Sequence, residues 1–155
     1  MNKDILIKTV SRLTLSPKGI LAIDESIPTC NKRFEKLGIE TSEENRRSYR
    51  ELLITTPNIE KYISGYILFD ETIRQKAIDN KSFTSILREK GIDIGIKVDQ
   101  GTKDFPSHFG EKITDGLNGL SVRLLEYKTM GSTFAKWRSI YTIGQNTPSE
   151  ECMEK

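Results

Sequence analysis

Cysteine, histidine and long apolar runs are scarce in this sequence, and their scarcity excludes several classes of protein. The 155 residues include two cysteines and one histidine. Cys30 and Cys152 have no CxxC spacing and His108 has no second ligand nearby, so we expect reduced thiols and no metal site. No apolar stretch approaches the roughly 20 residues of a membrane-spanning helix, so we expect no membrane partner.

An excess of charge of one sign is also missing. The chain has 24 Lys and Arg residues against 22 Asp and Glu residues, a formal net charge of +2. This balance does not favour nucleic acid or an anionic membrane surface as a partner, so any anion site must be local. With 35% hydrophobic and 30% charged residues, the composition is typical of a soluble globular protein, and we expect one cytoplasmic domain over residues 1–155.

Short apolar segments predict a parallel sheet. Four runs rich in β-branched and apolar residues, each bounded by turn signals, predict strands at residues 19–23, 62–69, 94–98 and 133–137. Helical patterning follows each of the first three runs. This alternation predicts an α/β fold whose strands pair in sequential order, as in a doubly wound sheet or a (β/α) barrel.

The helices between these strands have recognisable ends. They are predicted at residues 30–37, from a capping box of Thr41 and Glu44 to Ile54, at residues 83–90 before a capping Gly91, and from about Asp115 to Gly131. The run EENRR in the second of these helices predicts a solvated face with ion pairs three and four residues apart.

Charged residues gather where the predicted strands end. The four strand ends carry Asp24, Glu25 and Ser26; Asp70 and Glu71; Lys97 and Asp99; and Lys136 and Arg138. Ligands of parallel α/β folds bind beyond the carboxyl ends of the strands, and side chains two residues apart share a face. We therefore expect Asp24, Lys97, Lys136 and Arg138 at one end of the sheet, on its concave side.

Two interpretations of these charges remain open. They can lie in solvent or form an ion-pair network that fixes register without chemistry. Alternatively, three cations and one or more carboxylates form a concave site suited to a small phosphorylated substrate. Crowded cations lower the pKa of a lysine, so Lys136 beside Arg138 would serve as a proton shuttle or as an imine-forming nucleophile.

Several blocks of the sequence, taken together, resemble one enzyme family. GILAIDES, EENRRSYRELL, YISGYILFDETIRQK, GIKVDQGT, GLNGLSVRLLEYKTMG, FAKWR and TPS occur in this order between about Ser16 and Pro148. They are similar to the N-terminal half of class I fructose-bisphosphate aldolase. The resemblance implies the first four βα units of a (β/α)8 TIM barrel, a half barrel in this chain.

The resemblance also implies an activity and roles for single residues. The family cleaves fructose 1,6-bisphosphate to dihydroxyacetone phosphate and glyceraldehyde 3-phosphate through a lysine Schiff base, without metal or organic cofactor. Asp24 would assist proton transfer and orient substrate, and Lys136 would assist formation and dehydration of the carbinolamine. The remaining positions that match the family are expected to contact substrate phosphate or hydroxyls: Ser26, Arg33, Lys97 and Arg138.

The last residues suggest a truncated barrel. Thr147, Pro148 and Glu150 predict a helix start, and a helix over residues 148–155 is shorter than the roughly 12 to 15 residues that an isolated helix needs. A short docked terminal helix is the alternative. The resemblance places the Schiff-base lysine beyond this sequence, so we expect an inactive fragment that at most binds sugar phosphate or self-associates through its unpaired edges.

Overall fold

The chain is described by a computed structural model that covers residues 3–106 and 108–155. These residues group into two compact units. The first unit runs to Lys97 and includes Tyr127–Ala135, and the second comprises Val98–Glu126 and Lys136–Lys155. The expectation of one domain over residues 1–155 stays a prediction.

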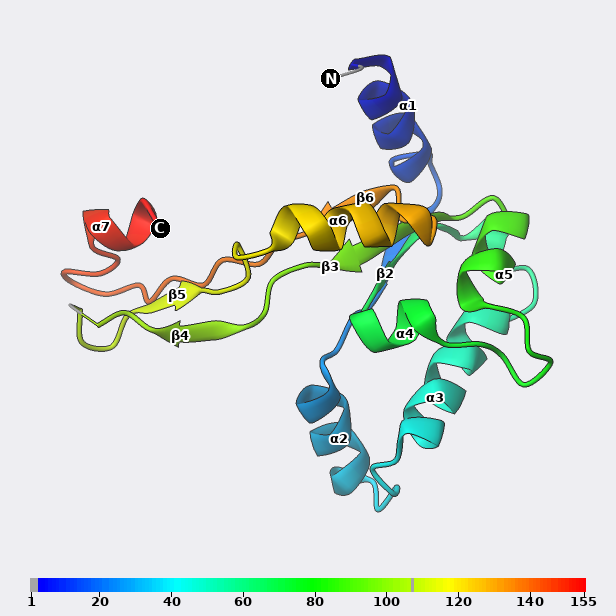
Figure 1. Cartoon of the computed structure of the whole chain (residues 1–155), viewed down its shortest axis with the longest axis horizontal. Coiled ribbons are helices and arrows are strands. Elements are labelled where there is room, and N and C mark those ends of the chain that lie inside the picture. The colour runs from blue at the N-terminus through cyan, green and yellow to red at the C-terminus, as the bar shows by residue number, and fades with distance from the viewer. Residues whose placement is uncertain (1–2, 107) are drawn as a thin grey trace. The chain divides into compact units, whose positions relative to one another are not determined.

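The main sheet has the predicted order. Strands β1 (Gly19–Ile23), β2 (Ile63–Leu68), β3 (Asp93–Lys97) and β6 (Phe134–Lys136) neighbour one another in the order β1-β2-β3-β6. Figure 1 labels β2, β3 and β6. The β1–β2 and β2–β3 pairs are parallel. β6 ends at Lys136, so Arg138, which was expected at the end of this strand, lies two residues beyond it. A strand extends only as far as its hydrogen-bonding neighbour, and β3 ends at Lys97.

The three helices predicted for the first unit, at residues 30–37, 41–54 and 83–90, are present with somewhat different ends, and the unit contains further helical elements that were not predicted. All of its helical elements are α1 (Lys3–Leu13), α2 (Ile27–Lys36), α3 (Glu43–Thr55), the 3-10 turn η1 (Ile59–Lys61), α4 (Asp70–Arg74) and α5 (Phe83–Glu89). α3 is capped by Ser42, whose hydroxyl accepts from the Asn45 N–H at 3.2 Å, and not by Thr41. Gly91 closes α5 with φ +67°, as predicted.

The second unit contains a ribbon that the sequence did not predict. Strands β4 (Thr102–Asp104) and β5 (Lys112–Thr114) pair antiparallel. Helix α6 (Leu120–Thr129) starts five residues later than predicted, because Gly116 and Gly119 adopt positive φ values of +123° and +69°. The final helix, α7 (Glu150–Met153), is capped by Ser149 and not by Thr147, so it is shorter than expected.

One face of the main sheet forms the core of the first unit. Its side chains include Tyr66, Leu68 and Ile94, which are fully buried. The Tyr66 hydroxyl donates to the Leu53 carbonyl of α3 at 2.7 Å, and burial raises the pKa of Tyr66 to about 12. The helices α3 and α5 pack together on this side (Figure 1).

The opposite face of the sheet is less covered. Ile20 of β1 keeps 46% of its surface exposed. A Cβ on Gly95 would lie 2.3 Å from Phe134 Cζ, and one on Gly65 would lie 2.6 Å from Leu13 Cδ2, so the two glycines leave room here for these side chains. This face is therefore partly covered by Leu13 and Phe134 and partly open to solvent.

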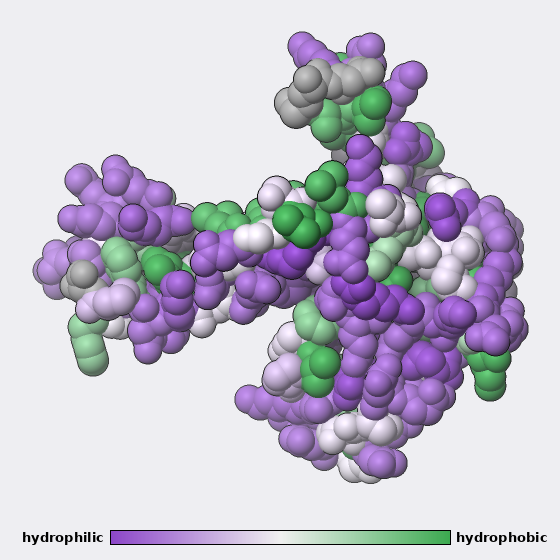
Figure 2. All heavy atoms as spheres, in the orientation of Figure 1, coloured by the Kyte–Doolittle hydropathy of each residue, from purple (hydrophilic) through white to green (hydrophobic). Residues whose placement is uncertain are grey.

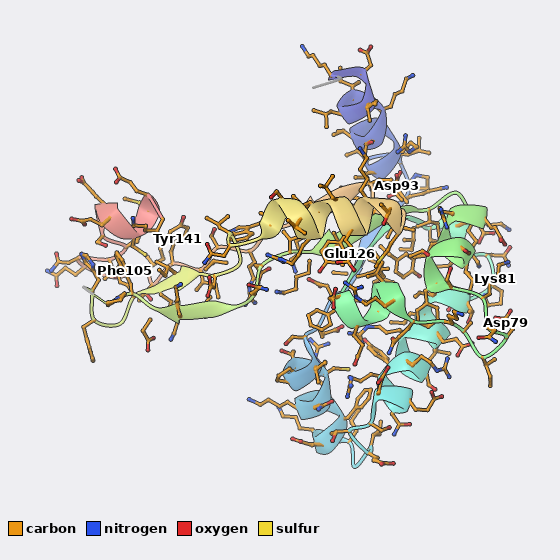
Figure 3. All side chains as sticks on the ribbon, viewed as in Figure 1. Asp79, Lys81, Asp93, Phe105, Glu126 and Tyr141 are labelled. Carbon is orange, nitrogen blue, oxygen red and sulfur yellow. The ribbon has the colours of Figure 1, made fainter. Side chains whose placement is uncertain are left out.

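The first helix is joined to the sheet by an ion pair. The Arg12 guanidinium donates two bonds, of 2.7 and 2.8 Å, to the carboxylate of Asp93 at the start of β3 (labelled in Figure 3), and Thr133 Oγ1 donates a third at 2.9 Å. Burial alone would raise the pKa of Asp93, but these hydrogen bonds outweigh it and hold the pKa below its ordinary value. No apolar residue of α1 is buried, so Arg12 is a principal anchor of this helix.

No helix within the described ranges is both long and apolar enough to cross a membrane.

Candidate functional site

The register of the sheet aligns two predicted site residues. Ile23, Leu68 and Ile96 are partners across β1, β2 and β3. Asp24 and Lys97 each follow this row by one residue. Because side chains alternate, both belong to the less covered face, with Gly95 and the Phe134 ring. Asp24 is 8% exposed and Lys97 is half-buried, so a carboxylate and an ammonium group lie at the carboxyl edge of one sheet.

Ser26 lies where the first strand passes into α2. It is the N-cap residue by its extended backbone, yet its hydroxyl makes no capping bond. Instead, Ser26 Oγ lies 3.0 Å from Thr29 Oγ1. Two hydroxyl groups therefore flank the first turn of a ten-residue helix, where unpaired N–H groups favour an anion.

Arg33 occupies a different place from the one predicted. The helix predicted over residues 30–37 puts Arg33 in its first turn. However, α2 begins at Ile27, where extended Ser26 and then Pro28 favour helix entry, so Arg33 lies in the last turn. Helical side chains point toward the helix N-terminus, and the Arg33 guanidinium reaches back to donate to Glu25 Oε1. Arg33 thus forms an ion pair with Glu25, which lies between the predicted site residues Asp24 and Ser26.

Glu25 is also contacted from α3. Arg50 Nη2 donates to the Glu25 main-chain carbonyl at 3.0 Å and lies 3.1 Å from Glu25 Oε2. The Tyr49 hydroxyl lies at the limit of bonding distance, 3.5 Å from Glu25 Oε1. Burial, and then the Glu25 charge, raise the pKa of Tyr49. Two guanidinium groups and a phenol therefore surround one carboxylate.

The predicted solvated face of α3 is wrong for one of its two arginines. Arg47 forms the expected pairs with Glu44 and Glu51. Arg46, however, is buried and donates two bonds, of 2.8 and 2.7 Å, to Glu71. Arg46, Arg50 and the buried Ile54 follow one another at intervals of four, and this stripe is the signal that could have predicted two inward-facing arginines.

The carboxylates after β2 serve neighbouring elements. Asp70 Oδ1 accepts from the Tyr127 hydroxyl at 2.9 Å and from Arg74 at 2.8 Å. Glu71 accepts the bonds from Arg46, and Arg46 also donates to Asn31 Oδ1 at 3.0 Å. These contacts join α2, α3 and α4 beside the carboxyl edge. They support the ion-pair interpretation for this strand end.

Lys136 and Arg138 belong to the second unit. Lys136 is the last residue of β6, where alternation puts its half-buried side chain on the same face of the strand as Phe134. Arg138 is exposed, and its main-chain carbonyl accepts from Thr114 Oγ1 at 2.9 Å. Their convergence with Asp24 and Lys97 stays a prediction.

The chemistry of the first unit's part of the site follows from its groups. Asp24 supplies a carboxylate, Lys97 and Arg33 supply cationic hydrogen-bond donors, and Ser26 supplies a hydroxyl. Over residues 3–106 and 108–155, no three His, Cys, Asp or Glu side chains gather as metal ligands would. The groups present suit a small polar anion such as a sugar phosphate.

Several known proteins are similar to this chain in sequence and in fold. The family model described as "Glycolytic: Fructose-bisphosphate aldolase class-I" matches residues 5–155. A probable fructose-bisphosphate aldolase class 1 of Xanthomonas campestris is 51% identical over 99% of this chain and 46% of its own length. A fructose-bisphosphate aldolase of Drosophila melanogaster is 47% identical over 95% of this chain and 41% of its own length.

A solved structure agrees with these matches. The aldolase of Plasmodium falciparum, crystallised in complex with TRAP and a small-molecule inhibitor, superposes with a TM-score of 0.93 at 41% identity, over 97% of this chain and 44% of that one. The α/β fold thus corresponds to part of the aldolase TIM barrel. The chain spans less than half the length of these relatives. From this match in sequence and fold, the chain belongs to the class I fructose-bisphosphate aldolase family.

Proposed function

We propose that the protein acts in the cleavage of fructose 1,6-bisphosphate to dihydroxyacetone phosphate and glyceraldehyde 3-phosphate. In this proposal, the charged residues at the carboxyl ends of its strands orient the substrate. The observation that carries this proposal is the alignment of Asp24 and Lys97. Each follows the buried row of Ile23, Leu68 and Ile96 by one residue, which puts both on the opposite, less covered face of a parallel sheet. A carboxylate and an ammonium group at the same edge, on strands that have β2 between them, match a polyol phosphate.

Each residue has a role in this proposal. Lys97 and Arg138 bind phosphate or hydroxyl oxygens, and Ser26 and Arg33 bind phosphate at the other end of the substrate. Asp24 orients the substrate hydroxyls and assists proton transfer where the carbon–carbon bond breaks. Lys136 exchanges protons with the carbinolamine as it loses water to form the imine.

Turnover by the 155-residue chain alone is not expected. The family resemblance assigns the imine-forming lysine to the part of the relatives that this chain does not span. Lys136 has the chemistry to form an imine, but an incomplete site stays wet and lacks the preorganised charges that lower the barrier. We therefore propose binding without cleavage, in the cytosol.

A coupled assay tests both halves of this proposal. The purified chain is mixed with fructose 1,6-bisphosphate, triose phosphate formation is coupled to NADH oxidation, and binding is measured in parallel by calorimetry. We expect saturable binding that Lys97→Met weakens, and no turnover above the buffer rate. Turnover that disappears in Lys136→Met would contradict the proposed inactivity, and absence of binding would contradict the proposed site.

A second proposal concerns partners. β1 has one hydrogen-bonding neighbour in the sheet, and the face that it shares with β2 exposes Ile20. Unpaired strand edges next to apolar surface favour pairing with another chain. We propose that the 155-residue chain self-associates through this edge.

A further inference from the structure

The ion pair between Arg33 and Glu25 bears directly on how the proposed phosphate site works. Arg33 is the more accessible partner, with 60% of its side chain exposed, whereas the side chain of Glu25 is 12% exposed. A phosphate arriving from solvent would therefore meet the guanidinium of Arg33 while Glu25 occupies it. Glu25 and phosphate carry the same sign of charge and use the same donors.

Glu25 does not depend on Arg33 for compensation. Arg50, whose side chain is 3% exposed, lies 3.1 Å from Glu25 Oε2 and also donates to the Glu25 carbonyl. Two cations thus face one carboxylate, leaving one positive charge in surplus. A buried carboxylate that loses one of two guanidinium partners keeps a charged neighbour, so release of Arg33 does not leave Glu25 unpaired.

We propose that Glu25 is an internal competitor for Arg33: sugar phosphate binding exchanges the Glu25 carboxylate for a phosphate oxygen on Arg33, while Arg50 retains Glu25. This inference rests on the proposed function and adds a specificity residue to it. A ligand must displace a carboxylate, so dianionic phosphate gains over monoanionic or neutral polyols. Glu25 thereby rejects weaker anions from this end of the site.

The affinity cost of this competition is modest. Exposed guanidinium–carboxylate pairs are worth about 0.2–1 kcal/mol, which corresponds to a change in binding of up to about fivefold. The direction in which affinity changes when Glu25 loses its charge distinguishes competition for Arg33 from a supporting role for Glu25. If Glu25 instead held Arg33 in a binding orientation, removal of its charge would weaken binding.

A double-mutant cycle with fructose 1,6-bisphosphate tests the proposal. Calorimetry is carried out on the 155-residue chain, on Glu25→Gln, on Arg33→Met and on the double variant. Glu25→Gln is expected to tighten binding by up to about fivefold, and Arg33→Met to weaken it about tenfold. The double variant should bind like Arg33→Met, because the competitor matters only when its cation is present. Glu35→Gln removes the same charge from an exposed position on α2 and should change nothing.

The unmodified chain offers a second readout if Glu25→Gln does not fold. Titration with fructose 1,6-bisphosphate should shift the Arg33 Nε–H resonance and leave that of Arg50 unchanged. Unchanged or weaker binding by folded Glu25→Gln, or an Arg50 resonance that moves with that of Arg33, would overturn the exchange while leaving the site intact. Absence of binding by every variant would overturn the exchange and the proposed function together.

Discussion

At the scale of single residues, buried arginines do more in this chain than its charge pattern indicates. Arg46 and Arg50 both lie on the inward stripe of α3 and contact carboxylates that follow β1 and β2. A buried guanidinium is tolerated because it is paired and hydrogen-bonded. Ion pairs from α3 therefore fix the segments that follow β1 and β2 at the carboxyl edge of the sheet.

Replacing either arginine that contacts Glu25 tests whether the buried ion pair stabilises the fold more than the exposed one does. Arg50→Met is expected to lower the free energy of unfolding by about 3 kcal/mol, because it removes the buried partner of Glu25. Arg33→Met removes an exposed partner of the same carboxylate and should cost about 0.5 kcal/mol. Urea unfolding followed by circular dichroism measures both. Equal losses for the two variants would show that burial does not set the worth of these contacts.

A buried carboxylate in the second unit predicts a pH dependence. Glu111 accepts from Ser149 Oγ at 2.6 Å and from the Ser149 N–H at 2.7 Å, and these bonds lower its pKa. A lowered pKa in the folded state gives stability that is present above the unfolded value of about 4.3 and is lost as the pH falls through the folded value. Acid is therefore expected to release α7.

Amide exchange of Cys152, whose N–H donates to Ser149 Oγ at 3.2 Å, follows this release. Protection should be constant from neutral pH down to about 5 and should fall below about 4.3. In Glu111→Gln, protection should be low already at neutral pH and insensitive to acid. If the Glu111→Gln chain still loses protection of the Cys152 amide in acid, a group other than Glu111 is responsible for the pH dependence.

At the scale of elements, the packing of the Phe134 ring of β6 against β3 depends on a glycine, Gly95. Gly95→Ala is expected to lower the free energy of unfolding by about 1–3 kcal/mol, because the new Cβ would overlap the Phe134 ring. Gly19→Ala, where no atom lies within 4 Å of the new Cβ, is the control and should change stability by less than about 0.5 kcal/mol. Thermal unfolding distinguishes the two, and equal effects would contradict the packing described for Phe134.

The elements also differ in how far the sequence predicts them. The buried strands carry continuous β-branched and apolar runs, so their existence and order were predicted correctly. β4 and β5 are three residues each and contain charged side chains, so hydrophobic periodicity gives no signal for them. The start of α6 was placed too early because the backbone conformations of Gly116 and Gly119 decide it, and periodicity alone does not reveal them.

The candidate site divides in the same way. Alternation within the strands, together with their observed register, puts Asp24 and Lys97 on a common face, and their part in a site stays a prediction. The partner of Arg33 was missed because it depends on where α2 begins and on how a long side chain turns back along its helix. Contacts between side chains of different elements, such as Arg50 with Glu25, follow from packing that one sequence does not display.

At the scale of the whole molecule, apolar surface remains exposed. Figure 2 shows apolar side chains gathered over α6, where Val122 and Leu125 are both exposed. Surface of this kind usually marks contact with another protein segment. It is consistent with a chain that spans less than half the length of its relatives.

Self-association is tested by sedimentation over a range of concentrations. We expect the chain to form dimers or larger species, and Ile20→Lys to shift the distribution toward monomer by placing a charge on the exposed face beside the β1 edge. Ile78→Lys is the control, because Ile78 is 88% exposed but lies outside the sheet. A chain that stays monomeric at every concentration, or an equal response to both substitutions, would contradict this interface.

The central claim is that the carboxyl ends of the strands form a sugar-phosphate site. Its most direct test is an NMR titration of the isotopically labelled chain with fructose 1,6-bisphosphate, read at every assigned backbone amide. We expect saturable shifts at the carboxyl ends of β1 and β3, at Asp24, Ser26 and Lys97 above all, and at Lys136. Shifts that do not saturate, or that appear at the basic residues of α1 and not at these strand ends, would contradict it.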